Sequence, residues 1–118
     1  MPPRDWRLRV EDILDSISAI AEFVRGMDLD AFQTDRKTRD AVIRNFIVIG
    51  EAANNVPPEV ADAHPEIPWK IMRDFRNFIV HVYFSVKMPV LWDTIQNDLP
   101  PLVPVLKRLL EAEGQSDK

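Results

Sequence analysis

Apolar side chains recur at intervals of three and four along almost the whole chain, the spacing that places them on one face of an α-helix. From Asp5 to Val24 this stripe consists of Trp6, Val10, Ile13, Leu14, Ile17, Ile20, Ala21 and Val24. A second stripe, in a helix from Thr34 or Asp35 to Asn55, consists of Val42, Ile43, Phe46, Ile47, Gly50 and Ala53. No run of β-forming residues is flanked by hairpin turns. The pattern therefore predicts an all-α protein.

Prolines and glycines mark where these helices begin and end. Gly26 is placed to end the first helix, and Pro57-Pro58 end the second. Pro68 suits the first turn of a third helix, which we predict from Trp69 to about Tyr83. Shorter helical turns are expected at residues 28–32 and 59–63.

The C-terminal third of the chain is predicted to be helical but interrupted. A fourth helix starts near Pro89, which is acceptable in a first turn. Pro100-Pro101 should bend or break this helix, because proline lacks the amide hydrogen and its ring clashes with the preceding turn. An apolar face then continues from Leu102 to Leu110. Together these elements predict an up-down bundle of four to five helices.

Length and composition limit the class of protein further. The 118 residues predict a single domain over residues 1–118, with a core between about residues 5 and 112. The chain contains no Cys, which excludes disulfide and thiolate chemistry. No apolar run approaches the roughly 18 residues that cross a bilayer, and the N-terminus is no signal peptide, so we expect a cytoplasmic protein without membrane contact. The net charge of −4 argues against general nucleic-acid binding but permits a local basic site.

The third helix departs from this acidic character. Residues 66–84 contain 3 basic and 2 acidic side chains, a net of +1, which leaves −5 for the rest of the chain. A wheel at about 100° per residue divides the helix into two sides. The apolar side contains Ile71, Met72, Phe75, Phe78, Ile79 and Val82. The polar side contains Arg73, Asp74, Arg76, Asn77 and His81, with Tyr83 at the border beside Arg76.

This polar side has two interpretations. It could be a solvated helix face with an Arg–Asp ion pair. It could also bind a phosphodiester, because Arg76 can hold the phosphate while His81 exchanges protons with the ribose 2′-hydroxyl or the leaving 5′-oxygen. Metal-independent cleavage of RNA needs both an acid and a base, and a twofold dimer would bring two copies of His81 together. With His64 as the only other imidazole and no Cys, a conventional zinc site is not expected.

The segment Arg76-Asn77-Phe78-Ile79-Val80-His81-Val82-Tyr83 consists of Arg, four residues, His, one residue and Tyr. This order resembles the signature of HEPN-domain proteins, and specifically of HepT-type toxins. The flanking residues 40–45, 49–53, 67–69, 90–92 and 97–100 are also similar to the pattern of that family. The resemblance therefore covers roughly residues 5–112.

The resemblance implies a HEPN-like helical bundle that forms a homodimer, with the two motif helices lining a shared cleft at the interface. It implies a metal-independent endoribonuclease that needs no cofactor for catalysis and is toxic to its host cell. Arg76 and His81 take the catalytic roles in this family pattern. Asn77 is the polar support, and Arg73 extends the same row by one helical turn.

The resemblance also implies a partner, a small MntA-type nucleotidyltransferase antitoxin. This enzyme uses ATP to attach AMP to the motif tyrosine, here Tyr83, and so silences the toxin. An added phosphate beside Arg76 would bring negative charge and bulk to the place where the RNA phosphate binds.

Three further side chains have structural and functional interpretations. Glu51 is either a capping or salt-bridge carboxylate, or a partner of Arg73 or Arg76 at the edge of the site. We expect His64 to be an ordinary surface residue and Trp69 to be an anchor in the core or an interface.

Two other functions remain open from the sequence. The same surface could bind a nucleotide or a partner enzyme without cleaving anything, as a non-catalytic HEPN module. The chain could also be a purely structural helical dimer, in which case mutations of the polar face would have no phenotype.

Overall fold

The computed structural model describes residues 5–85 and 87–116, with side chains described for residues 5–80 and 87–112. Its helices are α1 (Trp6–Phe23), α2 (Leu29–Thr34), α3 (Arg36–Asn54), α4 (Pro58–Ala63), α5 (Trp69–Ser85), α6 (Met88–Asp93) and α7 (Leu102–Ser116). A π-helical turn, η1 (Thr94–Asp98), follows α6. The described residues contain no β-strand, so the prediction of an all-α protein is confirmed.

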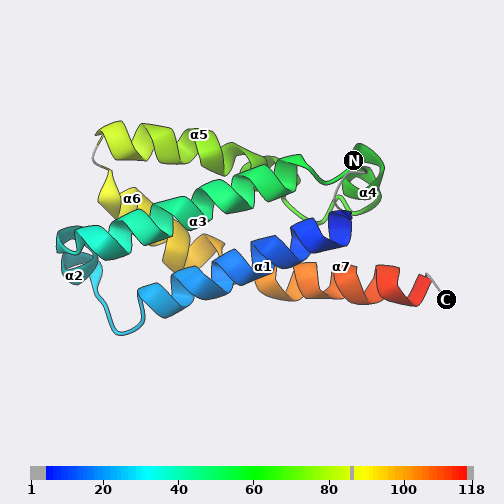
Figure 1. The fold of residues 1–118 in the computed structure, drawn as a ribbon, viewed down its shortest axis with the longest axis horizontal. Helices are drawn as coiled ribbons and strands as arrows, with labels where there is room; N and C mark the ends of the chain where they lie inside the picture. The colour runs from blue at the N-terminus through cyan, green and yellow to red at the C-terminus, as the bar shows by residue number, and fades with distance from the viewer. Residues whose placement is uncertain (1–4, 86, 117–118) are drawn as a thin grey trace.

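Four helical passes run back and forth along the long axis of the molecule. Helices α1, α3, α5 and the segment α6–η1–α7 alternate in direction, and α3 lies between α1 and α5 (Figure 1). The molecule measures 49 × 27 × 26 Å, so it is elongated along these helices. This arrangement leaves the outer side of α5 without a covering helix among the described elements (Figure 1).

Aspartates begin three of the helices. The side chains of Asp5, Asp28 and Asp35 accept hydrogen bonds from backbone amides in the first turns of α1, α2 and α3, at 2.9, 2.8 and 3.0 Å. Such caps satisfy amides that have no partner within the helix. The backbone amide of Thr38 stabilises the ionised form of Asp35 and so lowers the pKa of that carboxyl group below its ordinary value.

Aromatic side chains hold α5 against α3. Phe46 of α3 is fully buried, and its ring centroid lies 5.1 Å from that of Phe75 and 6.4 Å from that of Phe78. Met72 and Ile79 of α5 are also buried on this side. Burial of these apolar groups fixes the rotation of α5 about its axis, and so determines which side chains face solvent.

The predicted number of four to five helices is wrong, because the described residues contain seven α-helices and η1. Two of them, α2 and α4, are the short helical turns expected near residues 28–32 and 59–63, and each has six residues. The predicted fourth helix is divided into α6, η1 and α7. Residues Pro100 and Pro101 separate η1 from α7, where the sequence predicts a bend or break. Before this break the chain widens into a π turn, in which the amide of Leu99 donates to the carbonyl of Thr94 at 3.2 Å.

Two apolar side chains do not lie where the periodicity places them. Ile71 belongs to the predicted apolar side of α5, yet 57% of its surface is exposed. Ile47, in the predicted stripe of α3, is 37% exposed. The reason is geometric: each apolar stripe is wider than the strip of helix surface that neighbouring helices cover, so residues at its edge remain in solvent.

Candidate active site on α5

The described part of the polar side of α5 faces solvent, as the sequence predicts. Arg73, Asp74, Arg76 and Asn77 are exposed, while the opposite side of the helix is buried against α3. Arg73 and Asn77 are four residues apart and therefore neighbours on one row of the helix surface. The structure thus gathers two guanidinium groups and one amide on an exposed surface.

Glu51 of α3 contacts Arg76 and not Arg73. Its Oε1 accepts a hydrogen bond from Nη1 of Arg76 at 2.5 Å, in an ion pair that joins residues 25 positions apart. The side chains remain 65% and 47% exposed, so water screens the pair and its contribution to stability is small. The pair instead restricts where the Arg76 guanidinium can lie, with donors left for an anion.

A glycine lies beneath this ion pair. A Cβ atom at Gly50 would lie 3.1 Å from the backbone nitrogen of Arg76 and 3.5 Å from the carbonyl oxygen of Met72. These are backbone atoms of α5, so α3 and α5 come close together at the point where Arg76 leaves its helix. Glycine allows this approach, which accounts for its position inside α3 despite a helix propensity about 1 kcal/mol poorer than that of alanine.

The Arg–Asp pair of the simpler interpretation does not form among the described side chains of α5. Asp74 instead accepts a hydrogen bond from Nζ of Lys70 at 2.7 Å, one helical turn earlier on α5. Arg73 has no hydrogen bond or ion pair within the described part of the chain. Both arginines of α5 are therefore available to an anionic ligand, although Glu51 shares Arg76.

His81 and Tyr83 belong to α5, but their side chains lie outside the described residues. Their predicted roles, as proton-transfer group and as target of modification, therefore stay predictions. The backbone of α5 continues through both positions, so the helical spacing on which the predictions depend is present.

His64 is not the ordinary surface residue that we expected. Its side chain is only 19% exposed, and its Nδ1 lies 3.4 Å from Oε1 of Glu66. Its carbonyl oxygen accepts a hydrogen bond from the indole nitrogen of Trp69 at 3.1 Å. Trp69 is itself buried, which confirms its predicted role as an anchor in the core.

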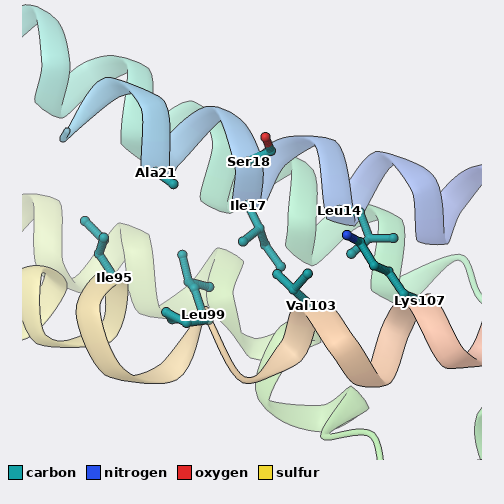
Figure 2. A pocket seen from close by; sticks show the side chains of 9 residues that line it. Leu14, Ile17, Ser18, Ala21, Ile95, Leu99, Val103 and Lys107 are labelled. Carbon is teal, nitrogen blue, oxygen red and sulfur yellow. The ribbon is translucent and has the colours of Figure 1, made fainter.

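A pocket of about 360 Å³ lies on another side of the molecule, between α1 and the η1–α7 segment (Figure 2). Its lining is mostly apolar, from Leu14 and Ile17 of α1 to Leu99 and Val103 of the η1–α7 segment (Figure 2). Its polar side chains are Ser18 and Lys107, with no arginine or histidine, so the exposed side of α5, with two arginines, is the better candidate site.

Two features are absent from the residues that the structure describes. No group of three His, Cys, Asp or Glu side chains in that part of the chain is arranged to hold a metal ion. None of its helices combines the length and the hydropathy needed to traverse a bilayer.

Comparison with known proteins identifies the family. Residues 13–109 match the family described as HepT-like, or Ribonuclease HepT-like, which confirms the resemblance found from the motif. A Thermococcus cleftensis protein named probable ribonuclease HepT is 42% identical over 100 residues, which cover 85% of this chain and 91% of that protein. A Methanocaldococcus jannaschii protein provisionally named as an RNase is 35% identical over 118 residues, covering 99% and 98%. No solved structure is significantly similar. The chain therefore belongs to the HepT-like ribonuclease family.

Proposed function

We propose that this protein is an endoribonuclease toxin that cleaves RNA without a metal ion, using the exposed side of α5. The observation that carries the proposal is the Arg76 guanidinium, which α5 presents to solvent and Glu51 of α3 holds at 2.5 Å. Membership of a ribonuclease family gives the activity class, and the arrangement of these side chains supports the place where it occurs.

The reaction that suits these groups is transesterification within the RNA. The 2′-hydroxyl oxygen attacks the adjacent phosphorus, the bond to the 5′-oxygen breaks, and the products are a 2′,3′-cyclic phosphate and a free 5′-hydroxyl. One imidazole removes the proton of the 2′-hydroxyl and a second supplies a proton to the leaving oxygen. Arg76 offsets the charge that grows on the phosphate oxygens, and Asn77 holds the neighbouring backbone.

A homodimer would supply the two imidazoles, because α5 contains one histidine, His81. Exposed apolar side chains support an interface around the site. Val80, one helical turn after Arg76 on α5, is 52% exposed, and Ile47, one turn before Glu51 on α3, is 37% exposed. Burying these groups against their copies across a twofold axis would place the two α5 helices face to face.

Regulation by a nucleotidyltransferase antitoxin completes the proposal. The Tyr83 oxygen attacks the α-phosphorus of ATP bound by that partner, pyrophosphate leaves, and the phenolic proton goes to solvent or a base. Tyr83 lies seven residues after Arg76, or almost two helical turns, so both residues fall on one side of α5. An adenylyl group there would compete with RNA for the Arg76 guanidinium.

Cleavage of RNA by the purified protein in EDTA tests the catalytic proposal. We expect 2′,3′-cyclic phosphate ends, and loss of cleavage in Arg76→Ala and His81→Ala. Arg25→Ala is a matched control, because Arg25 also forms an exposed ion pair, with Glu22 at 2.6 Å, but lies outside α5. Unchanged activity in His81→Ala would contradict the catalytic assignment, and RNA binding without cleavage by the unaltered protein would favour the non-catalytic module.

Co-expression with a small MntA-type nucleotidyltransferase tests the regulatory proposal separately. Intact mass should increase by one or more AMP units in the unaltered chain and stay constant in Tyr83→Phe. An equal mass increase in Tyr83→Phe would place the modification elsewhere.

A further inference from the structure

A second cavity adjoins the Arg76 site at the end of α5 where that helix begins. It has a volume of about 690 Å³, within the range of small-molecule sites, and lies among α3, α4 and the start of α5. We refer to it as the α4–α5 pocket. Its polar lining residues are Asn54, Asp62, Lys70 and Arg73.

The pocket continues the surface of the proposed active site. Arg73 lies one helical turn before Arg76 on α5, and Asn54 lies one turn after Glu51 on α3. The two helices run in opposite directions, so both steps lead toward the same end of the α3–α5 pair, where α4 lies (Figure 1). An RNA strand held at Arg76 therefore reaches the pocket with its next nucleotides.

The walls of the pocket are fixed by the loop between α4 and α5. The indole of Trp69 is 5% exposed and donates to the carbonyl of His64, which also accepts the amide of Ile67 at 3.2 Å. Pro65 and Pro68 restrict the backbone of this loop further. A cavity held in this way exists before a ligand arrives, which reduces the entropy lost on binding.

Three of the polar groups have unused hydrogen-bonding capacity. Within the described part of the chain, no hydrogen bond or ion pair involves the side chains of Asn54, Asp62 or Arg73. Lys70, in contrast, is engaged by Asp74 at 2.7 Å. The pocket thus offers a carboxylate from α4, which only accepts, a guanidinium from α5, which only donates, and an amide from α3, which does both.

We propose that the α4–α5 pocket binds a guanine base of the RNA substrate, next to the nucleotide that is cleaved; this inference rests on the proposed function. Guanine presents two neighbouring donors, N1–H and the N2 amine, which suit the carboxylate of Asp62. It also presents two neighbouring acceptors, O6 and N7, which suit the guanidinium of Arg73. Adenine and cytosine offer a single amine beside an acceptor, and uracil offers one N–H between two carbonyls. Only guanine uses both charged groups in bidentate form.

Binding of RNA that cannot be cleaved tests the pocket independently of catalysis. The probes are short 2′-O-methyl oligouridylates that contain one guanine, one inosine or one adenine. We expect about tenfold tighter binding of the guanine probe than of the adenine probe, as a bidentate contact gives. Inosine, which lacks the N2 amine, should fall between them. Asp62→Asn and Arg73→Gln should each remove most of this preference, whereas the exposed Asp15→Asn on α1 should retain it.

Sequencing the ends produced from a random RNA pool completes the test. Guanine should be enriched at one fixed position beside the cut, and the ends that Asp62→Asn produces should lack that enrichment. Equal affinity for the guanine and adenine probes would overturn the subsite even if RNA is cleaved. Tighter binding of free guanosine monophosphate than of the guanine probe would also overturn it, in favour of a free nucleotide. Guanine-selective binding without any cleavage would support the subsite while refuting the proposed function.

Discussion

Replacing Gly50 with alanine tests how closely α3 and α5 must approach to position Arg76. Alanine favours the helix by about 1 kcal/mol over glycine. Its Cβ, however, would lie 3.1 Å from the backbone nitrogen and 3.4 Å from the Cβ of Arg76. Backbone in the middle of α5 cannot move aside alone, so the whole helix must shift by a few tenths of an ångström. Overpacking of this kind costs about 1–3 kcal/mol, so we expect a net loss of about 1 kcal/mol.

Thermal unfolding and RNA cleavage should be measured together for Gly50→Ala. A loss of about 1 kcal/mol corresponds to a decrease in Tm of about 4 °C for a domain of this size. Displacement of Arg76 from its place beside Glu51 should also reduce kcat severalfold, because catalysis is sensitive to sub-ångström errors in position.

A matched control separates these two effects. Gly26 has a φ of 78° and no atom within 4 Å of an added Cβ, so Gly26→Ala destabilises the protein through local backbone strain of about 1–2 kcal/mol. This variant should lose stability but retain cleavage at a temperature where it is folded. A Gly50→Ala variant whose free energy of unfolding rises by about 1 kcal/mol, and which keeps its activity, would refute this role of Gly50.

Three further predictions follow from other contacts. Glu51→Gln should change the free energy of unfolding by less than about 1 kcal/mol, since the ion pair is exposed. It should lower kcat without raising KM, because Arg76 is no longer held in place. A rise in KM alone would contradict this prediction. Asp35→Ala should lower Tm at neutral pH. The Thr38 amide holds the pKa of Asp35 below its ordinary value of about 3.9, so this contribution is complete above that pH and is lost as the pH falls below it; a Tm difference that persists unchanged near pH 2 would be inconsistent. Phe46→Ala, at a fully buried ring, should cost about 3–5 kcal/mol by urea denaturation, and a loss below about 1.5 kcal/mol would show that the core rearranges.

The long helices are predicted well because the apolar period and the residues that begin and end helices indicate the same segments. The third helix is expected from Trp69 to about Tyr83 and is observed from Trp69 to Ser85. Its apolar side is buried at Met72, Phe75 and Ile79, as the wheel predicts. The helical period and the proline before the first turn both depend on residues close together in the chain, so a single sequence is enough to detect them.

Contacts between helices are less accessible to sequence reasoning. Periodicity predicts that Glu51 and Arg76 both face outward near the site, but it leaves open whether Glu51 pairs with Arg73 or Arg76. That choice depends on the register between α3 and α5, which the close approach at Gly50 fixes. No sequence pattern indicates Asp62 as a site residue. It lines the α4–α5 pocket only because the loop between those helices brings α4 close to α5.

The shared nature of the site is the central claim, and diluting the active protein with an inactive variant tests it most directly. Unaltered protein and His81→Ala are co-expressed in varied proportions, and total cleavage of RNA in EDTA is measured at a constant total concentration of protein. If each site needs His81 from both protomers, mixed dimers are inactive and total activity follows the square of the unaltered fraction, about one quarter at equal amounts. Total activity proportional to that fraction, about one half at equal amounts, would show that each protomer acts alone and would contradict the account.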